Sequence, residues 1–127
     1  FARLVFVERD EGSNTERAMT ARPESLGDMI LGRKDTPTSY HLSVVHDDAL
    51  QGVTHVIRGD DLRASTHIHV LLQKLLGLPT PIYRHHALLT GPDGKRYAKR
   101  DRSLTLAALR EAGVSAADIR SRIGLPV

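Results

Sequence analysis

Cysteine and tryptophan are absent from this chain of 127 residues, and aromatic side chains make up only 4% of it. Without cysteine the chain can form neither a disulfide nor a thiolate-ligated metal site, and the absence of cysteine is consistent with a cytoplasmic location. Because aromatic residues are so few, we expect a hydrophobic core built mostly from leucine, valine, isoleucine and alanine.

Long apolar runs are missing as well. No stretch approaches the roughly 18 apolar residues that a membrane-spanning helix needs, and the opening FARLVFVERDEG has neither the basic start nor the long apolar core of a signal peptide. We therefore expect no membrane partner. The first residue is not methionine, so we expect the chain to be a piece of a longer protein.

The residues that are present describe one ordinary globular domain. Hydrophobic residues make up 40% of the chain and charged residues 26%, and a chain of this length can bury one modest core. The formal net charge of +3 favours anionic partners such as nucleotides or nucleic acid. We expect a single domain over residues 1–127, and a monomer.

β-branched and apolar residues predict strands in the first half of the chain. Residues 1–7, FARLVFV, read as a strand, and residues 8–23, where apolar periodicity is weak, read as a flexible loop. The apolar runs at residues 39–46 and 53–58 are joined by DDALQG, which predicts a β-hairpin. The second run ends in Arg-Gly-Asp-Asp, a sequence typical of a strand-to-helix turn that opens into a cleft.

Helical spacing prevails in the second half of the chain. The stretch STHIHVLLQKLLGLP predicts a helix, because its leucines and isoleucine recur every three or four residues, its Ser or Thr can cap the start, and Gly-Leu-Pro ends it. A short strand is expected in TPIYRHHALL. The last segment predicts two helices, which are separated by Gly113, and the second begins with Ser115-x-x-Asp118, a pattern typical of a capping box.

Seven histidines raise the question of a metal site. His67 and His69 are two apart on the expected helix and point in different directions, while the adjacent His85 and His86 on a strand face opposite sides, so neither pair can share one metal. The two Asp-Asp pairs can bind Mg²⁺, but adjacent acids at turns are more often helix caps or solvated corners. We therefore assign no metal site to the chain.

Tyr40 and Arg58 are more suggestive of a binding site. The sequence has no Gly-x-Ser-x-Gly, His-Glu-x-x-His or phosphate-loop motif, which removes the best support for a hydrolase or a simple P-loop protein. If the arms that carry Tyr40 and Arg58 are neighbouring strands, the hydroxyl and the guanidinium converge at one end of a sheet, where the guanidinium can bind a carboxylate bidentately. The alternative is a Tyr at the edge of the core and a surface Arg.

The stretch DGKRYAKRD, residues 93–101, concentrates basic side chains behind a turn. Such a loop can fold over a triphosphate and neutralise charge that develops on the phosphates in a transition state. A solvated basic hairpin tip has the same composition, so local chemistry leaves both interpretations open.

Taken together, these motifs resemble a known family. Over roughly residues 27–124 their order and spacing are similar to the C-terminal half of the catalytic core of class I glutamyl-tRNA synthetases. The similar segments are SYHLSVVHDDA at 39–49, GVTHVIRGDDL at 52–62, Ser65-Thr66, LGLP at 76–79 and RYAKRD at 96–101. Arg-Gly-Asp-Asp-Leu resembles the short paralogue, glutamyl-queuosine tRNA(Asp) synthetase, more than the full-length enzyme.

The resemblance implies an α/β fold, as part of a Rossmann-type class I aminoacyl-tRNA synthetase catalytic core with a helical C-terminal segment. Residues 27–90 would form the sheet and helix of the core and residues 91–127 the signature loop and C-terminal helices, while residues 1–26 lead into the core with few structural signals. It also implies ATP with Mg²⁺ as a substrate, activation of L-glutamate to glutamyl-adenylate, and transfer to the queuosine base of tRNA(Asp).

The resemblance also implies roles for particular residues. In this family a Tyr and an Arg at the positions of Tyr40 and Arg58 bind glutamate. Lys99 takes the place of the second lysine of the signature loop, which contacts the ATP phosphates. The loop falls on Arg96, Tyr97, Ala98, Lys99 and Arg100.

The sequence departs from the family pattern at several of these positions. Arg96 keeps the charge of the usual first lysine, but Tyr97 and Ala98 replace Leu or Met and Ser, which removes a hydroxyl. His69 stands where the family often has Gln.

The resemblance places half of the active site outside this chain. The His-Ile-Gly-His-type motif that completes the ATP site would lie upstream, as would the cysteine-rich insertion that holds zinc, so we expect the chain alone to be inactive. Two alternatives remain, namely a fragment of an ordinary glutamyl-tRNA synthetase and a non-catalytic RNA- or protein-binding module derived from a synthetase.

Overall fold

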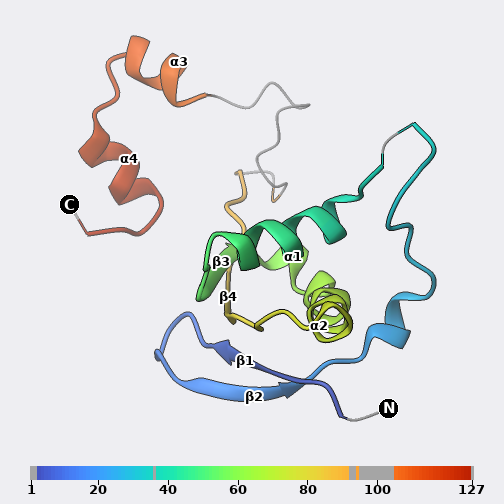
Figure 1. Cartoon of the computed structure of the whole chain (residues 1–127). Coiled ribbons are helices and arrows are strands. Elements are labelled where there is room, and N and C mark those ends of the chain that lie inside the picture. Colours follow the sequence, from blue (N-terminus) through green and yellow to red (C-terminus); the bar gives the residue numbers. More distant parts are fainter. Residues whose placement is uncertain (1–2, 36, 92–93, 95–104, 127) are drawn as a thin grey trace. The chain divides into compact units, whose positions relative to one another are not determined.

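The computed structural model describes residues 3–35, 37–91, 94 and 105–126 (Figure 1). Contacts divide the chain into two compact units, Phe1–Ala87 and Leu88–Val127. Within the described part of the chain, no helix has the length and apolar character that crossing a membrane requires.

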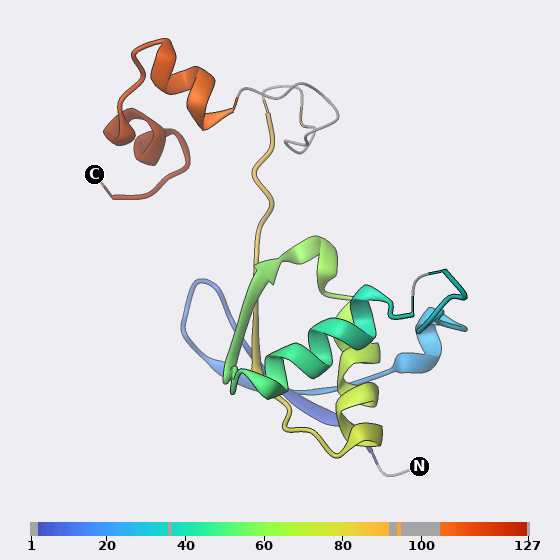
Figure 2. The same cartoon turned by 45° about the horizontal axis from the view of Figure 1, so that its top comes forward.

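The first unit is built on a mixed sheet of four strands, β1 (Val5–Arg9), β2 (Glu16–Thr20), β3 (His55–Gly59) and β4 (Ile82–His86). Their order is β2-β1-β4-β3. β1 is antiparallel to β2 and parallel to β4, and β4 is parallel to β3. The helices of this unit are η1 (Pro23–Leu26), α1 (Tyr40–Leu50), η2 (Asp60–Leu62) and α2 (Ser65–Leu76), and α1 and α2 lie beside each other on the sheet (Figures 1 and 2). The α/β class is confirmed.

Helix α2 carries the core of this unit, as its apolar spacing predicts. Val70 packs with Phe6 and Tyr83 of the sheet. Ile68 and Leu72 pack instead with Val45 of α1, so the helix is buried both toward the sheet and toward its neighbouring helix. Its end is as expected, because Gly77 adopts a left-handed φ of 66°. Its start differs, since the N-cap is Ala64 without a side-chain cap and η2 leads almost directly into the helix.

The hairpin predicted for residues 39–58 is wrong in its first arm. Residues Tyr40–Leu50 form α1, because the side chain of Ser39 accepts a hydrogen bond from the backbone N–H of Leu42 and so caps a helix. The paired valines suggested a strand, yet Val45 is buried against α2 in the company of Ile68. Packing against a neighbouring helix outweighs the weak β preference of valine.

The flexible loop predicted for residues 8–23 is also wrong in part. β2 pairs with β1 along its whole length, from Thr20 opposite Val5 to Glu16 opposite Arg9. The side chains of β2 are almost all exposed, so no buried alternation announces this strand in the sequence. The ion pair between Arg9 and Glu16 across the two strands supports it instead.

The parallel strands bring three polar side chains to one edge of the sheet. β1, β4 and β3 run in the same direction, so their carboxyl ends meet there. Arg58 of β3 is the register partner of His85 of β4, and Glu8 stands opposite Tyr83. In open α/β sheets ligands bind outside the carboxyl ends of the strands, so this edge is where a site is expected.

The second unit contains the two C-terminal helices predicted from the sequence, α3 (Leu106–Glu111) and α4 (Ala116–Arg122). Thr105 caps α3, and Ser115 with Asp118 forms the expected capping box at the start of α4. The hydrogen bonds from Ser115 hold the pKa of Asp118 below its ordinary value.

Candidate functional site

Arg58 lies near the carboxyl end of β3, and its guanidinium is held by three hydrogen bonds. Nε donates to Nε2 of His85 at 3.2 Å. The terminal nitrogens donate to Nδ1 of His69 at 3.1 Å and to Oγ1 of Thr66 at 2.6 Å. The ring of Tyr83 faces the guanidinium, with Cζ 5.2 Å from the ring centroid. Side chains from β4 and α2 therefore fix the orientation of this arginine.

Among the described residues, the charge of Arg58 is not matched by a direct ion pair. None of the ion pairs with N···O within 4.0 Å in that part of the chain includes this guanidinium. Its three hydrogen bonds go to imidazole nitrogens and a hydroxyl and use three of the five N–H donors of a guanidinium. A fixed guanidinium with further donors and no carboxylate in contact is suited to bind a carboxylate from outside.

His85 connects Arg58 to the end of β1. Because its Nε2 accepts from Arg58, the ring proton is on Nδ1, which donates to Oε1 of Glu8 at 2.8 Å. Burial lowers the pKa of His85, and the positive charge of Arg58 adds to this against the opposing hydrogen bond to Glu8. Glu8 also pairs with Arg63, which bonds Asp60. Glu8 is thus held by two partners and can fix the ring of His85.

His69 extends the network from Arg58 to α1. Its Nε2 lies 3.0 Å from Nδ1 of His41. Burial, followed by the charges of Arg58 and His41, lowers the pKa of His69 to about 3, so the ring is neutral at pH 7. A neutral imidazole carries one N–H, and since Nδ1 of His69 accepts from Arg58, Nε2 donates to His41.

Tyr40 and Arg58 both contact His69, although they do not lie on neighbouring strands as expected. Tyr40 is the first residue of α1, and its ring centroid is 5.9 Å from that of His69 in an edge-on arrangement. The side chain of Tyr40 is half-exposed, and with His41 it lines a cavity of about 510 Å³ against residues 28–33. The two residues therefore do reach the same end of the sheet.

The predicted orientations of the histidine pairs are confirmed. His67 contacts Phe6 and accepts from the backbone of Arg22, whereas His69 faces Arg58, so the two rings point in different directions. On β4, His85 is buried and His86 is exposed. Among the described residues, no three acidic or histidine side chains gather closely enough to hold a metal ion.

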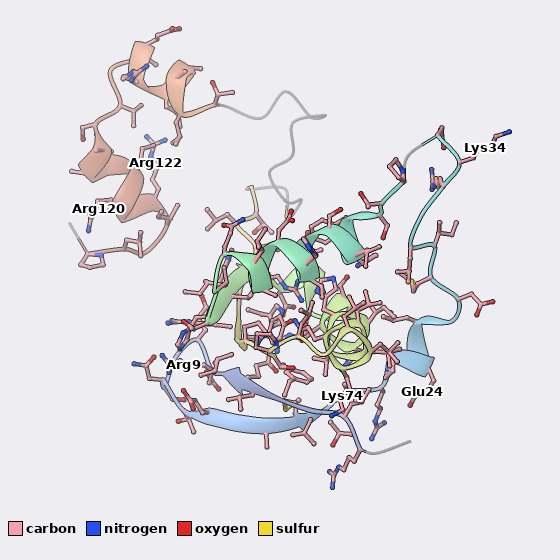
Figure 3. The ribbon with its side chains drawn as sticks, viewed as in Figure 1. Arg9, Glu24, Lys34, Lys74, Arg120 and Arg122 are labelled. Carbon is pink, nitrogen blue, oxygen red and sulfur yellow. The ribbon has the colours of Figure 1, made fainter. Side chains whose placement is uncertain are left out.

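Sequence reasoning missed four side chains that hold Arg58 or its neighbours, namely Glu8, Thr66, His69 and His85. The sequence contains one usable signal, because Thr66 and His69 are three apart on a helix that directly follows the strand of Arg58. The signature loop at Arg96 to Arg100, and Lys99 with it, lies outside the described residues. Side chains from the sheet, α1 and α2 meet in the space between these elements, whereas Lys34 points away from them (Figure 3).

Known proteins are similar to this chain over most of its length. Residues 14–125 match the family described as class I tRNA synthetases (E and Q), catalytic domain. A glutamyl-Q tRNA(Asp) synthetase of Rhodobacter capsulatus is 57% identical over 108 residues, which cover 82% of this chain and 39% of that protein. The protein of the same name from Symbiobacterium thermophilum is 52% identical over 93 residues, 73% of this chain and 29% of that protein.

A solved structure is similar as well. A glutamate tRNA ligase from Elizabethkingia meningosepticum, in complex with its amino acid, superposes with a TM-score of 0.58 at 31% identity and covers 76% of this chain and 19% of that one. The chain thus spans well under half the length of the relatives it matches. The expected fold, part of a class I catalytic core, is confirmed. The chain belongs to the class I glutamyl- and glutaminyl-tRNA synthetase family, within its catalytic domain.

Proposed function

We propose that this chain is part of an ATP-dependent enzyme that activates L-glutamate as glutamyl-adenylate and transfers the glutamyl group to queuosine of tRNA(Asp). The names of the curated relatives support this substrate and this tRNA. The observation that carries the proposal is Arg58, which is held in one orientation by His69, His85 and Thr66 and forms no ion pair within the described residues.

Arg58 binds a carboxylate of glutamate, and Tyr40, at the start of α1, lies against His69, which bonds Arg58. A carboxylate offers two acceptor oxygens to a guanidinium. The amide of glutamine offers one oxygen and turns N–H donors toward the donors of Arg58, which costs affinity because like groups face each other. This arrangement favours glutamate over glutamine if the side-chain carboxylate is the group that Arg58 holds.

The reaction then needs ATP at the other part of the site. A carboxylate oxygen of glutamate attacks the α-phosphorus of ATP, the bond to the β-phosphate oxygen breaks, and pyrophosphate leaves, with Mg²⁺ accompanying ATP as part of the substrate. Lys99 stabilises the negative charge on the phosphates. In the second step a queuosine hydroxyl attacks the activated carbonyl, and AMP leaves.

ATP–pyrophosphate exchange with L-glutamate, measured on the full-length protein that contains this sequence, tests the proposal. We expect exchange without tRNA, and transfer of labelled glutamate to tRNA(Asp) that carries queuosine. Exchange only in the presence of tRNA would indicate an ordinary glutamyl-tRNA synthetase. No exchange under either condition, together with salt-dependent RNA binding, would indicate a non-catalytic binding module. The isolated 127-residue chain serves as the control and should not catalyse exchange.

A further inference from the structure

His69 occupies a position between the two residues assigned to glutamate. It lies on α2 and is 1% exposed, and both of its ring nitrogens have partners. Nδ1 accepts from Arg58, and Nε2 lies 3.0 Å from Nδ1 of His41. The edge of the Tyr40 ring lies against the same imidazole. Any rotation of this ring therefore moves the hydrogen-bond partner of Arg58.

The hydrogen bonds leave only one tautomer for each ring. Arg58 has donors and no acceptors, so Nδ1 of His69 must carry a lone pair and its proton must be on Nε2. That N–H points to Nδ1 of His41, which must then also carry a lone pair. The hydrogen bonds therefore run in one direction, from the guanidinium of Arg58 to His69 and from His69 to His41.

We propose that His69, as the neutral Nε2–H tautomer that its bonds to Arg58 and His41 require, is the positioning residue that sets the orientation of Arg58 toward the carboxylate of glutamate. The identity of the bound carboxylate rests on the proposed function, whereas the tautomer and the positioning of Arg58 do not. His69 does not touch the substrate in this arrangement; it acts through Arg58.

This chain of hydrogen bonds depends on an acceptor at Nδ1 of His41. A donor in place of that acceptor would face the N–H of His69, and a His69 ring with its proton on Nδ1 could no longer accept from Arg58. The other groups that face this pair are Arg58 from β3, Tyr40 on the same helix, and Asp28 and Arg33, which line the same cavity as His41. Asp48 of α1 is near Arg58, and its pKa is raised by burial against the lowering effect of Arg58.

Variants of His69 test the proposal in the full-length protein by pyrophosphate exchange. In His69→Gln the amide oxygen accepts from Arg58 and the amide nitrogen donates to His41, so we expect a KM for glutamate within about threefold of the original. In His69→Leu both bonds are lost, and we expect the KM for glutamate to rise roughly 10- to 100-fold, as for a lost hydrogen bond to a charged group, with the KM for ATP unchanged. His41→Leu removes the acceptor of His69 and should raise the KM for glutamate several-fold, whereas His46→Leu, at an exposed position on α1, is the matched control and should leave this KM unchanged.

A tautomer measurement keeps the test independent of activity. Histidine-selective ¹⁵N NMR of the same protein should show His69 neutral with its proton on Nε2 at pH 7, and this also serves if His69→Leu does not fold. An Nδ1–H tautomer, equal damage by Gln and Leu, or equal rises in both KM values would overturn the role of His69. If the original protein shows no glutamate-dependent exchange, the proposed function fails, and the tautomer measured by NMR still tests the bonds of His69 to Arg58 and His41.

Discussion

His85 of β4 stands opposite Arg58 of β3 in the parallel sheet, and its Nε2 accepts a hydrogen bond from Nε of Arg58 at 3.2 Å. The register of two strands thus places an acceptor next to a guanidinium at the carboxyl edge of the sheet. Because His85 is in turn bonded to Glu8 of β1, all three parallel strands contribute to holding one arginine. The orientation of Arg58 is a property of the sheet as well as of local contacts.

Replacement of Arg58 by alanine should weaken the binding of glutamate far more than the binding of ATP. The substitution removes the charge and the donors that face the carboxylate, so we expect the KM for glutamate in pyrophosphate exchange to rise at least about 100-fold, the equivalent of about 3 kcal/mol for a charged hydrogen bond. Arg17→Ala on β2, where the arginine side chain is 68% exposed, is the matched control and should change neither KM. A similar rise in the KM for ATP and for glutamate would show that the assigned role is wrong.

Loss of the helix cap at Ser39 should weaken the binding of glutamate, because it loosens the helical turn that holds Tyr40. Ser39→Ala removes the acceptor for the backbone N–H of Leu42 and should reduce the free energy of unfolding by about 1 kcal/mol. Because α1 begins at Tyr40, fraying of its first turn should also raise the KM for glutamate several-fold. Thr105→Ala removes the cap of α3 and offers the comparison. If both variants change the KM equally, the effect does not come from the first turn of α1.

Acidification should destabilise the protein through its buried histidines. Burial holds the pKa of His69 at about 3 and also lowers that of His85, so the unfolded chain takes up protons that the folded chain does not. The free energy of unfolding should therefore fall as the pH drops below about 6.5, with a contribution of up to about 1.4 kcal/mol per pH unit from His69 until its folded pKa is reached.

Urea denaturation at pH 7, 6 and 5 measures this slope. His69→Gln removes one titrating group and should make the slope shallower, whereas His46→Gln, on the exposed face of α1, should leave it unchanged. A slope in His69→Gln as steep as in the original protein would mean that His69 is already protonated in the folded state.

The buried pair of Gln73 and Tyr83 should show strong coupling. Nε2 of Gln73 donates to the hydroxyl of Tyr83 at 2.8 Å, and burial raises the pKa of this phenol. Tyr83→Phe leaves the amide donor without a partner and should cost about 1 to 3 kcal/mol of the free energy of unfolding, while adding Gln73→Leu should recover part of that loss because the buried amide, whose oxygen already has no partner, is then gone. Additive effects in a double-mutant cycle would contradict the bond.

The sequence predicts well those elements in which buried residues recur at regular spacing. The apolar residues of helix α2 recur at helical spacing because they pack against the sheet and against α1. In β4, Tyr83 and His85 are buried, and the residues next to them are more exposed. Helix α1 is different, because its pair of valines satisfies a strand pattern as readily as a helical one, and only the capping contact of Ser39 and the presence of α2 decide between them. β2 leaves no apolar trace at all, since its side chains are exposed.

Tyr40 and Arg58 could be predicted as site residues from the sequence, whereas the side chains that hold Arg58 were harder to predict. The motif resemblance singled out Tyr40 and Arg58, and the structure brings both to His69. The acceptors of Arg58 were harder to predict. The bond to His85 depends on the register of β3 and β4, and the bonds to Thr66 and His69 depend on how α2 packs beside the sheet, although their spacing on the helix is a signal. The residue type alone does not show whether a histidine is buried beside an arginine or exposed to solvent.

The crossover from β3 through α2 to β4 can be inherited as one continuous segment. Arg58 and the four side chains that hold its guanidinium, Thr66, His69, Tyr83 and His85, all lie within this one continuous segment. A recombination event that exchanged residues 55–86 between two such proteins would transfer the arginine together with its acceptors. The transferred guanidinium would keep its orientation only where the recipient also has Glu8, which bonds His85, and His41, which bonds His69.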